Sequence, residues 1–283
     1  MKFSEEQLKM VAQNLSPSLL GSIIEHTLLN SQATQTELEN LCKEANEIGA
    51  SICINEGRLQ EIFKYVNENN FKNLRKIVAV IGFPLGATST KIKIFSALCS
   101  LDSGADEVDM VLNIGYLRDN PQKCKDDILK VAQAISDFNK KNKLNKILKV
   151  IQENCYLSDD EKRLASRIIA EVAQETGLRM FAKTSTGFGK PKDSSIPIGA
   201  TVEDAALMYE IIKPFQKKGV SIGIKAAGGV SDSIAALEMM AVAGCFDENL
   251  KPLSNIADVF RIGASAGKKI VVDFKQRFKK IKK

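Results

Sequence analysis

Four ionisable side chains lie inside sequence segments that are otherwise apolar. They are Asp109 in VDMV, Lys149 in ILKVI, Lys183 in FAKTS and Lys225 in GIKAAG. A charged group is costly to bury unless it is paired or has a function. A lysine that extends to solvent, or a structural ion pair, would explain any one of them. Four such residues in successive segments favour a shared site.

Three lysines and one aspartate in one site favour covalent amine chemistry. Ammonium groups that lie close together lower one another's pKa, which leaves a neutral amine able to attack a carbonyl carbon at neutral pH. The expected product is a Schiff base. The chain has a single histidine, His26, and no carboxylate and imidazole residues at metal-ligand spacing. Metal-assisted chemistry and a Ser-His-Asp triad are therefore poorer explanations, and we expect no metal site.

Two glycine-containing segments could bind a phosphate group. KAAGGVSDS places Gly228 and Gly229 between an expected strand and an expected helix, and RIGASAGKK places Gly263 and Ser265 similarly. Free backbone N–H groups at the start of a helix bind anions. Tight turns alone would explain either segment, but a phosphorylated carbonyl substrate explains both.

The segments that carry these residues alternate with longer segments of helical periodicity, which indicates parallel β-α-β construction. Eight strands are expected around Ile24, Cys53, Val78, Asp109, Lys149, Lys183, Lys225 and Ile262. Helices are expected over residues 36–48, 89–103, 126–139, 159–176, 202–213 and 232–243. Eight such units in 283 residues predict a (β/α)8 TIM barrel with an extra N-terminal helix near residues 5–14.

A closed barrel also fits the positions of the candidate residues. An open doubly wound sheet would usually carry a G-x-G-x-x-G turn after its first strand, and none follows residues 23–27. Barrel active sites lie at the C-terminal ends of the strands, where we expect the four charged residues, and phosphate commonly binds after strands seven and eight. The segment GFGKPKDSSIPIGAT predicts a long loop on the same face.

Composition suits one large α/β domain over residues 1–283, with a helical extension over 1–20 and a basic C-terminal helix over 266–283. No apolar run of about 18 residues is present, and the acidic N-terminus is unlike a signal peptide. The six cysteines form no CxxC pair, which fits reduced thiols. We therefore expect a cytoplasmic protein that does not bind membranes.

The net charge of +6 has a disproportionate contribution from the C-terminal segment KKIVVDFKQRFKKIKK. An arm that binds nucleic acid is one interpretation. Ile270, Val271, Phe274 and Phe278 recur at helical spacing, however, so an amphipathic helix packed on the barrel is favoured and no nucleic-acid partner is expected.

Along nearly its whole length the chain resembles the deoxyribose-phosphate aldolases. The motifs, in order, are IEHTLL from Ile24, ICIN from Ile52, GADEVDMVLNIG from Gly104, KVIQE from Lys149, FAKTSTGF from Phe181, GATVEDAALM from Gly199, IKAAGGV from Ile224 and FRIGAS from Phe260. The resemblance implies reversible cleavage of 2-deoxy-D-ribose 5-phosphate to D-glyceraldehyde 3-phosphate and acetaldehyde, in deoxyribonucleotide catabolism.

The resemblance also implies roles for individual residues. Lys183 would form the imine with the substrate, Lys225 would lower the pKa of Lys183, and Asp109 would relay protons through water. Lys149 would belong to the same charge network. Backbone groups of the loops would bind the phosphate at Gly187, Gly228, Gly229, Gly263 and Ser265. No cofactor would be needed, since the protonated imine is itself the electrophile.

The chain departs from the family pattern in three places. Glu25 replaces the aspartate that usually precedes His-Thr, the loop after KTSTG is longer by about GKPKDSSIP, and the C-terminus from Ala266 lacks the tyrosine tail of some members. Cys53 lies near the pocket in the family pattern, but an inert buried thiol is the favoured interpretation. His26 is expected to be a structural residue. A homodimer is the expected assembly.

Two other functions fit part of the pattern. A different lysine-type barrel aldolase would act on another phosphorylated sugar. An inactive barrel could instead bind nucleic acid through its C-terminal lysines, and that binding would weaken with salt. The intact pair of Lys183 and Lys225 argues against the second alternative.

Overall fold

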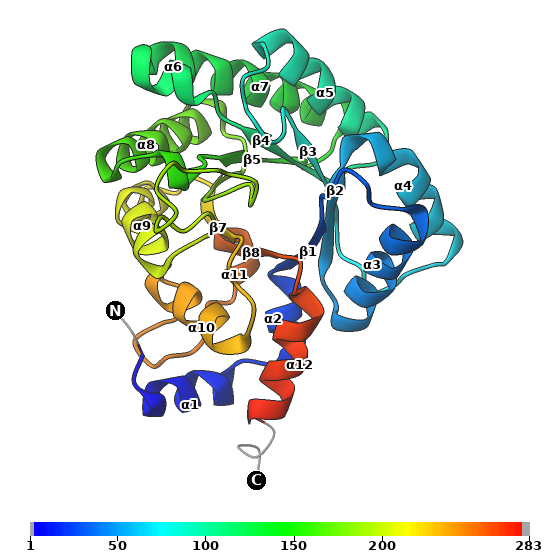
Figure 1. The fold of residues 1–283 in the computed structure, drawn as a ribbon, viewed down its shortest axis with the longest axis vertical. Coiled ribbons are helices and arrows are strands. Elements are labelled where there is room, and N and C mark those ends of the chain that lie inside the picture. Colours follow the sequence, from blue (N-terminus) through cyan, green and yellow to red (C-terminus); the bar gives the residue numbers. More distant parts are fainter. Residues whose placement is uncertain (1–2, 279–283) are drawn as a thin grey trace.

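The computed structural model describes residues 3–278, in which eight parallel strands form a closed barrel surrounded by helices (Figure 1). Each strand pairs with the next one in the sequence, and β8 pairs with β1. The strands are β1 Ile24–Leu28, β2 Ser51–Asn55, β3 Ile77–Ile81, β4 Glu107–Val111, β5 Ile147–Ile151, β6 Met180–Lys183, β7 Ile222–Ala227 and β8 Phe260–Ala264. The predicted (β/α)8 barrel and its eight strands are confirmed.

The helices that follow the strands are close to the predicted ones, and several short helices were not predicted. The helices are α1 Glu5–Asn14, α2 Pro17–Ser22, α3 Gln35–Ile48, α4 Leu59–Glu68, α5 Thr90–Asp102, α6 Ile114–Asp119, α7 Pro121–Asn142, α8 Asp159–Thr176, α9 Val202–Lys217, α10 Ser233–Val242, α11 Ile256–Val259 and α12 Gly267–Phe278. Short 3-10 turns follow β2 and β5, at Glu56–Arg58 and Asn154–Tyr156.

Local capping explains where several helices begin. Ser158 and Glu161 form a capping box at the start of α8, and Thr34 and Glu37 form one at α3. The prediction for α7 was too short, because Asn120 caps a helix whose first residue is a proline. The helices α2, α4, α6 and α11 were missed, and three of them, α2, α6 and α11, are six residues long or shorter.

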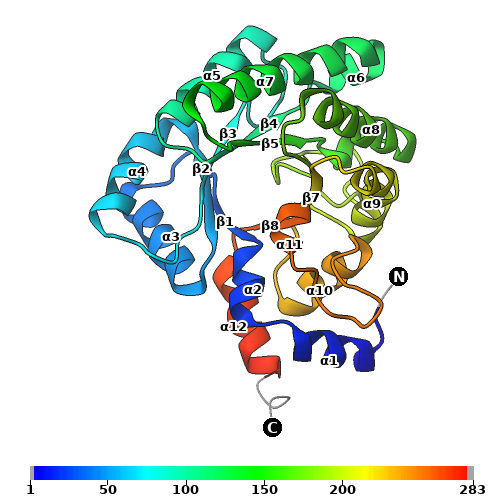
Figure 2. The ribbon, with the colours of Figure 1, turned by 180° about the vertical axis from the view of Figure 1, so that it is seen from behind.

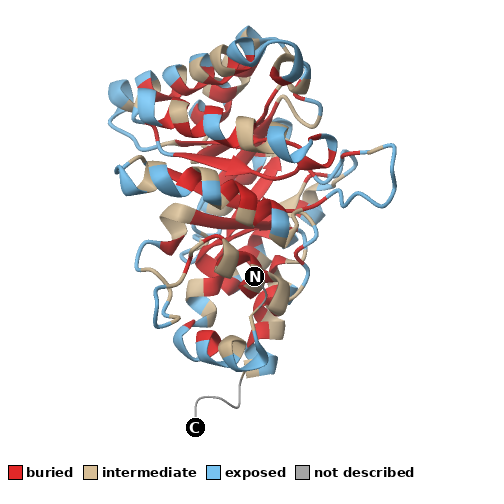
Figure 3. Cartoon of the chain, turned by 90° about the vertical axis from the view of Figure 1, so that its left-hand side faces the viewer, coloured by how far each residue is buried: buried red, intermediate tan, exposed pale blue. Residues whose placement is uncertain are grey.

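The strands are buried at the centre of the molecule, and the helices expose their outer faces (Figure 3). Alternation of side chains along the strands gives the barrel two separate apolar clusters. The larger cluster fills the space between the outer face of the strands and the helices. The smaller one lies inside the barrel, where Leu29, Cys53, Val78 and Val80 pack with Phe83. Strands β2 and β3 therefore supply an apolar wall of the interior, and the charged residues come from the other strands.

The two terminal helices lie side by side, with α1 against α10 and α12 (Figures 1 and 2). Helix α12 contacts α2, α3 and β1, and it buries Ile270, Val271 and Phe274. The described part of the basic C-terminal segment is thus an amphipathic helix packed on the barrel. Residues 279–283, the last part of the expected helix over 266–283, lie outside the described residues. Among the described residues, no helix is both long and apolar enough to cross a membrane.

Candidate active site

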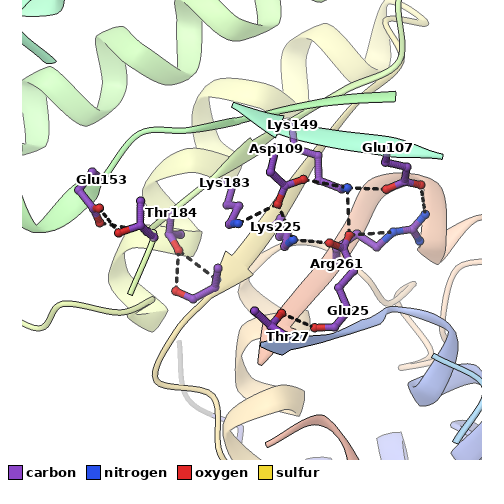
Figure 4. Close-up of polar contacts among 12 residues, drawn as sticks. Glu25, Thr27, Glu107, Asp109, Lys149, Glu153, Lys183, Thr184, Lys225 and Arg261 are labelled. Carbon is purple, nitrogen blue, oxygen red and sulfur yellow. Dashed lines mark hydrogen bonds and ion pairs between the residues drawn. The ribbon is translucent and has the colours of Figure 1, made fainter. Parts of the chain in front are cut away.

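Alternate positions of β1 and of β4 to β8 bring seven ionisable side chains together inside the barrel (Figure 4). We call this set the lumen charges; its members are Glu25, Glu107, Asp109, Lys149, Lys183, Lys225 and Arg261. Each is buried, with at most 8% of its surface exposed. The sequence analysis named five of them and missed Glu107 and Arg261. Both lie two positions before a candidate residue of the same strand, Asp109 or Gly263, and this period-2 spacing was the available signal.

The position of these residues along their strands corrects one prediction. We expected all four interior charges at the C-terminal strand ends, but only Lys183 is the last residue of its strand. Asp109, Lys149 and Lys225 lie in the middle of β4, β5 and β7. The difference arises because a sequence segment does not reveal how far the closed sheet extends. Lys183 consequently lies nearest the barrel mouth, with the other charges beneath it.

Asp109 is the centre of the lumen charges. Its Oδ2 accepts hydrogen bonds from Lys183 Nζ and Lys225 Nζ, each at 2.7 Å, and its Oδ1 accepts one from Lys149 Nζ at 3.1 Å. Burial alone would raise the pKa of Asp109, but the three ammonium groups hold that pKa well below its usual range. Asp109 is therefore an anion at any working pH.

The three lysines differ in their proton affinity although all are buried. Burial lowers the pKa of Lys183, and the Lys225 ammonium lowers it further, against the opposing effect of Asp109. Burial also disfavours the charge on Lys225, but Asp109 and Glu25 raise its pKa well above the usual value. Lys149 has a raised pKa for the same reason, with Asp109, Glu107 and Glu25 as its partners. Lys183 is thus the lysine that gives up its proton most readily.

The number of acids and bases among the lumen charges favours the loss of one proton from the set, and Lys183 is the lysine that loses it most readily. Three acids face four bases, so the fully ionised set carries one excess positive charge. A net charge in a buried site is unfavourable, because little water remains to stabilise it. Loss of one proton from Lys183 makes the set neutral and supplies the free amine that attack on a carbonyl requires.

Glu25 fits the site despite its extra methylene relative to the family's usual aspartate. Its Oε2 pairs with Lys225 Nζ, and its Oε1 lies 3.2 Å from Lys149 Nζ. Arg261 lies 3.8 Å from Glu25 and 3.7 Å from Glu107, and Glu107 also pairs with Lys149. The longer side chain therefore bridges two lysines rather than disrupting the network.

A cavity of about 710 Å³ opens above the lumen charges at the C-terminal end of the barrel. Lys183 is the one member of that set in its lining. The five predicted phosphate-site residues all line it as well: Gly187, Gly228, Gly229, Gly263 and Ser265. Residues 184–201 form neither helix nor strand, and Phe188, Pro197, Ile198 and Gly199 from this long loop complete one wall. The fold thus places an amine next to a glycine-lined pocket.

Gly228 and Gly229 form the turn after β7, and the hydrogen bonding of Gly228 limits what it can contribute to a ligand. The N–H of Gly228 donates to the carbonyl of Gly263 at 3.1 Å and is already used. Both Gly228 and Gly229 have positive φ, 78° and 76°, a conformation that glycine adopts without strain. The N–H of Gly228 is therefore not free for a ligand, whereas its positive φ shapes the turn.

Three atoms near the site lie close enough together to suggest a metal, one each from Glu25, Cys53 and Asp109, within 4.8 Å of one another. Their chemistry does not fit one. Both carboxylates already pair with lysine ammonium groups, which a cation would have to displace. Burial raises the pKa of the Cys53 thiol, which disfavours the thiolate that binds metals. Cys53 instead packs in the apolar wall, and His26 contacts Glu44 and the Ala264 carbonyl on the outer side of β1.

Individual proteins of known name and structure resemble this chain over most of its length. No family model matches the chain. The deoxyribose-phosphate aldolase of Thermococcus kodakarensis is 40% identical over 254 residues, which cover 89% of this chain and 95% of the relative. That of Coprothermobacter proteolyticus is 36% identical over 255 residues, 89% of this chain and 96% of the relative. The tetrameric deoxyribose phosphate aldolase of Aeropyrum pernix has a similar fold, with a TM-score of 0.71, 24% identity, and coverage of 97% and 100% of the two chains.

Proposed function

The chain belongs to the deoxyribose-phosphate aldolase family, and we propose that Lys183 is the residue through which it cleaves 2-deoxy-D-ribose 5-phosphate. The observation that carries the assignment is the position of Lys183. It is the one lumen charge that lines the cavity, and its pKa is lowered by burial and by Lys225. The products of cleavage are D-glyceraldehyde 3-phosphate and acetaldehyde, and the reaction serves deoxyribose phosphate catabolism.

The reaction begins when neutral Lys183 Nζ adds to the substrate aldehyde carbon. The carbinolamine loses water and becomes an iminium, which draws electrons from the bond between C2 and C3. As that bond breaks, the C3 hydroxyl loses its proton and glyceraldehyde 3-phosphate leaves. The enamine on Lys183 is then protonated at its terminal carbon, and water hydrolyses the imine to release acetaldehyde.

The other lumen charges support these steps. Asp109 lies 2.7 Å from Lys183 Nζ, where its negative charge stabilises the iminium. Because the pKa of Asp109 is so low, it moves protons through a water molecule that it orients and is a weak base by itself. Lys225 keeps its proton and stabilises the negative charge that develops on the C3 oxygen as it loses its proton. Lys149 and Glu25 hold Asp109 and Lys225 in place.

The phosphate of the substrate binds in the same cavity as Lys183. The supporting observation is that Gly187, Gly229, Gly263 and Ser265 line this cavity together with Lys183, and that Gly229 leads toward the N-terminus of α10. A phosphorylated sugar therefore reaches from these residues to Lys183.

Cleavage of 2-deoxy-D-ribose 5-phosphate is expected to proceed unchanged after exhaustive treatment with EDTA. The protonated imine supplies the electrophile, so neither a metal nor an organic cofactor is needed. Acetaldehyde and glyceraldehyde 3-phosphate should appear in equal amounts, measured with coupled dehydrogenase assays. Fructose 1,6-bisphosphate as the control substrate should give no product. Activity that is lost on chelation and regained with a divalent ion would contradict this proposal.

A homodimer and a cytoplasmic location are also proposed. Leu85, Ile92 and Phe95 are large apolar side chains that are 78%, 52% and 66% exposed; Leu85 precedes α5, and the other two lie three residues apart within it. Exposed large apolar side chains of this kind favour a contact surface between proteins. Sedimentation equilibrium is expected to give twice the chain mass, and a monomer mass would contradict the proposed homodimer.

The cysteines support the proposed cytoplasmic location. All six are unpaired thiols, as in proteins of a reducing compartment. We propose that the whole chain works as one barrel unit.

A further inference from the structure

A buried carboxylate outside the lumen charges lies next to the active-site cavity. Glu153 follows β5 directly after Gln152, and only 3% of its surface is exposed. Its backbone has φ 59° and ψ 62°, in the left-handed region that a residue other than glycine seldom adopts. Such strained residues persist where their surroundings hold them, often at functional sites. In Figure 4, Thr184 lies between Glu153 and Lys183, the lumen charge on that side of the set.

The carboxylate of Glu153 is occupied by one residue of the long loop. Its Oε1 accepts a hydrogen bond from the Thr186 N–H at 3.1 Å, and its Oε2 accepts one from the Thr186 hydroxyl. The same hydroxyl oxygen accepts the N–H of Phe188 at 2.9 Å. Glu153 therefore fixes Thr186 directly and Phe188 through it. These two residues flank Gly187, and all three line the cavity.

The start of the loop has an anchor of its own. The N–H of Thr184 donates to the Lys225 carbonyl at 3.1 Å, and the Thr184 hydroxyl is bonded to both the carbonyl and the N–H of Ala227. These contacts hold the end of β6, and with it Lys183, against β7. Loss of the Glu153 contacts should therefore move residues 186–188 while Lys183 stays in place.

Packing around Glu153 shows that the loop is fitted closely to it. A Cβ atom at Gly189 would overlap Cys155 Sγ and would lie 3.5 Å from the Glu153 carboxyl carbon. Phe188 also packs edge-to-face on Phe83, with ring centroids 5.3 Å apart. Glu153 itself does not line the cavity, and both its oxygens are bonded to Thr186, so it cannot reach the substrate.

We propose that Glu153 is a positioning residue that holds Thr186, Gly187 and Phe188 in the shape that receives the substrate phosphate. Through this loop Glu153 sets how strongly the enzyme prefers a phosphorylated aldose to the same aldose without its phosphate. The inference rests on the proposed phosphate site and adds the residue that keeps one wall of it in order.

The test compares 2-deoxy-D-ribose 5-phosphate with 2-deoxy-D-ribose for the parent, Glu153→Ala and Glu153→Gln. For Glu153→Ala, the ratio of kcat/KM for the two substrates should fall about tenfold or more, mainly because KM for the phosphorylated substrate rises. Glu153→Gln should keep part of the ratio, since its amide oxygen can still accept the Thr186 N–H. Ser166→Ala is the matched control: it removes a buried hydrogen bond to the neighbouring Gln152 without touching the loop, and the ratio should not change.

Thr186→Val keeps the side-chain volume but removes the hydroxyl that joins Glu153 to Phe188. It should lower the same ratio even if Glu153→Ala does not fold. An equal loss for both substrates, or an unchanged ratio, would overturn the inference, because a purely structural role affects both substrates alike. Borohydride trapping of acetaldehyde on Lys183 separates the two proposals. Trapping in parent and variant with an unchanged ratio refutes only the role of Glu153, whereas no trapping in the active parent refutes the role of Lys183.

Discussion

Lys183→Ala is expected to abolish cleavage of 2-deoxy-D-ribose 5-phosphate, with kcat reduced on the order of 10⁴-fold or more. The variant lacks the nucleophile, so no iminium forms and the bond between C2 and C3 has no electron sink. Lys183→Arg should be equally inactive. Its guanidinium stays protonated and cannot add to a carbonyl, although it keeps the positive charge beside Asp109.

Trapping identifies the residue as well as the chemistry. The parent treated with acetaldehyde and sodium borohydride should carry a reduced adduct on the peptide that contains Lys183, measured by mass spectrometry after digestion. Lys93 is an internal control in the same digest. It is equally buried and pairs with Asp127 at 2.7 Å, but it lies outside the site and should remain unmodified. An adduct that maps to another lysine of an active enzyme would overturn the assignment.

Lys225→Leu is expected to move the rising limb of the pH profile of kcat/KM to higher pH. The Lys225 ammonium lowers the pKa of Lys183 and also shares Asp109 Oδ2 with it. Without Lys225 the repulsion is lost and Asp109 interacts more fully with Lys183, so both changes raise the pKa of Lys183. Below that pKa, each unit of increase lowers the neutral fraction about tenfold. Activity near neutral pH should fall steeply and should partly recover in alkali.

The same substitution also lowers stability, but this effect has a different pH dependence. Glu25 and Asp109 each lose a buried partner, at a cost of about 3–5 kcal/mol. Because the pKa of Lys225 is raised in the folded state, its contribution to stability is fully present below the unfolded pKa of about 10.4. That contribution is lost only as the pH rises through the folded pKa. The loss of stability is therefore constant over the assay range and cannot imitate a displaced limb.

The measurement is kcat/KM against pH for parent, Lys225→Leu and Lys225→Arg, with thermal unfolding at the same pH values. Lys225→Arg retains a positive charge at this position and should leave the limb near its parental pH, even if its bulk lowers kcat. An activity loss of equal size at every pH, with the limb unmoved in the leucine variant, would show that Lys225 acts only as a structural partner of Asp109.

Much of the architecture could be predicted from the amino-acid order because it depends on local periodicity. Apolar segments separated by segments of helical periodicity predicted all eight strands. Charged residues inside otherwise apolar segments also stand out in the sequence, so Asp109, Lys149, Lys183 and Lys225 were recognised as candidate buried charges without coordinates. Three of the four helices that were missed, α2, α6 and α11, are too short for periodicity to appear, whereas α4 has ten residues and was overlooked for another reason.

The tertiary structure decided how these charges differ from one another. All three lysines among the lumen charges are buried. Their different distances to Asp109, Glu25 and Glu107 explain why the pKa of Lys183 is lowered while the pKa values of Lys149 and Lys225 are raised. Those distances depend on the register around the closed barrel, which pairs residues far apart in sequence.

The same reason explains the residues that the sequence did not reveal. Arg261 and Glu107 come from β8 and β4 and meet only across the barrel interior. The N–H of Gly228 is used by Gly263 of the next strand, and Glu153 finds Thr186 across the gap between β5 and the loop after β6. Residue types and local spacing are properties of the chain, so the sequence determined the fold class and the kind of chemistry. The proton affinity of a buried group depends on all the charges near it in space, and its hydrogen bonds depend on which groups the fold brings next to it. Only the folded barrel therefore determined them.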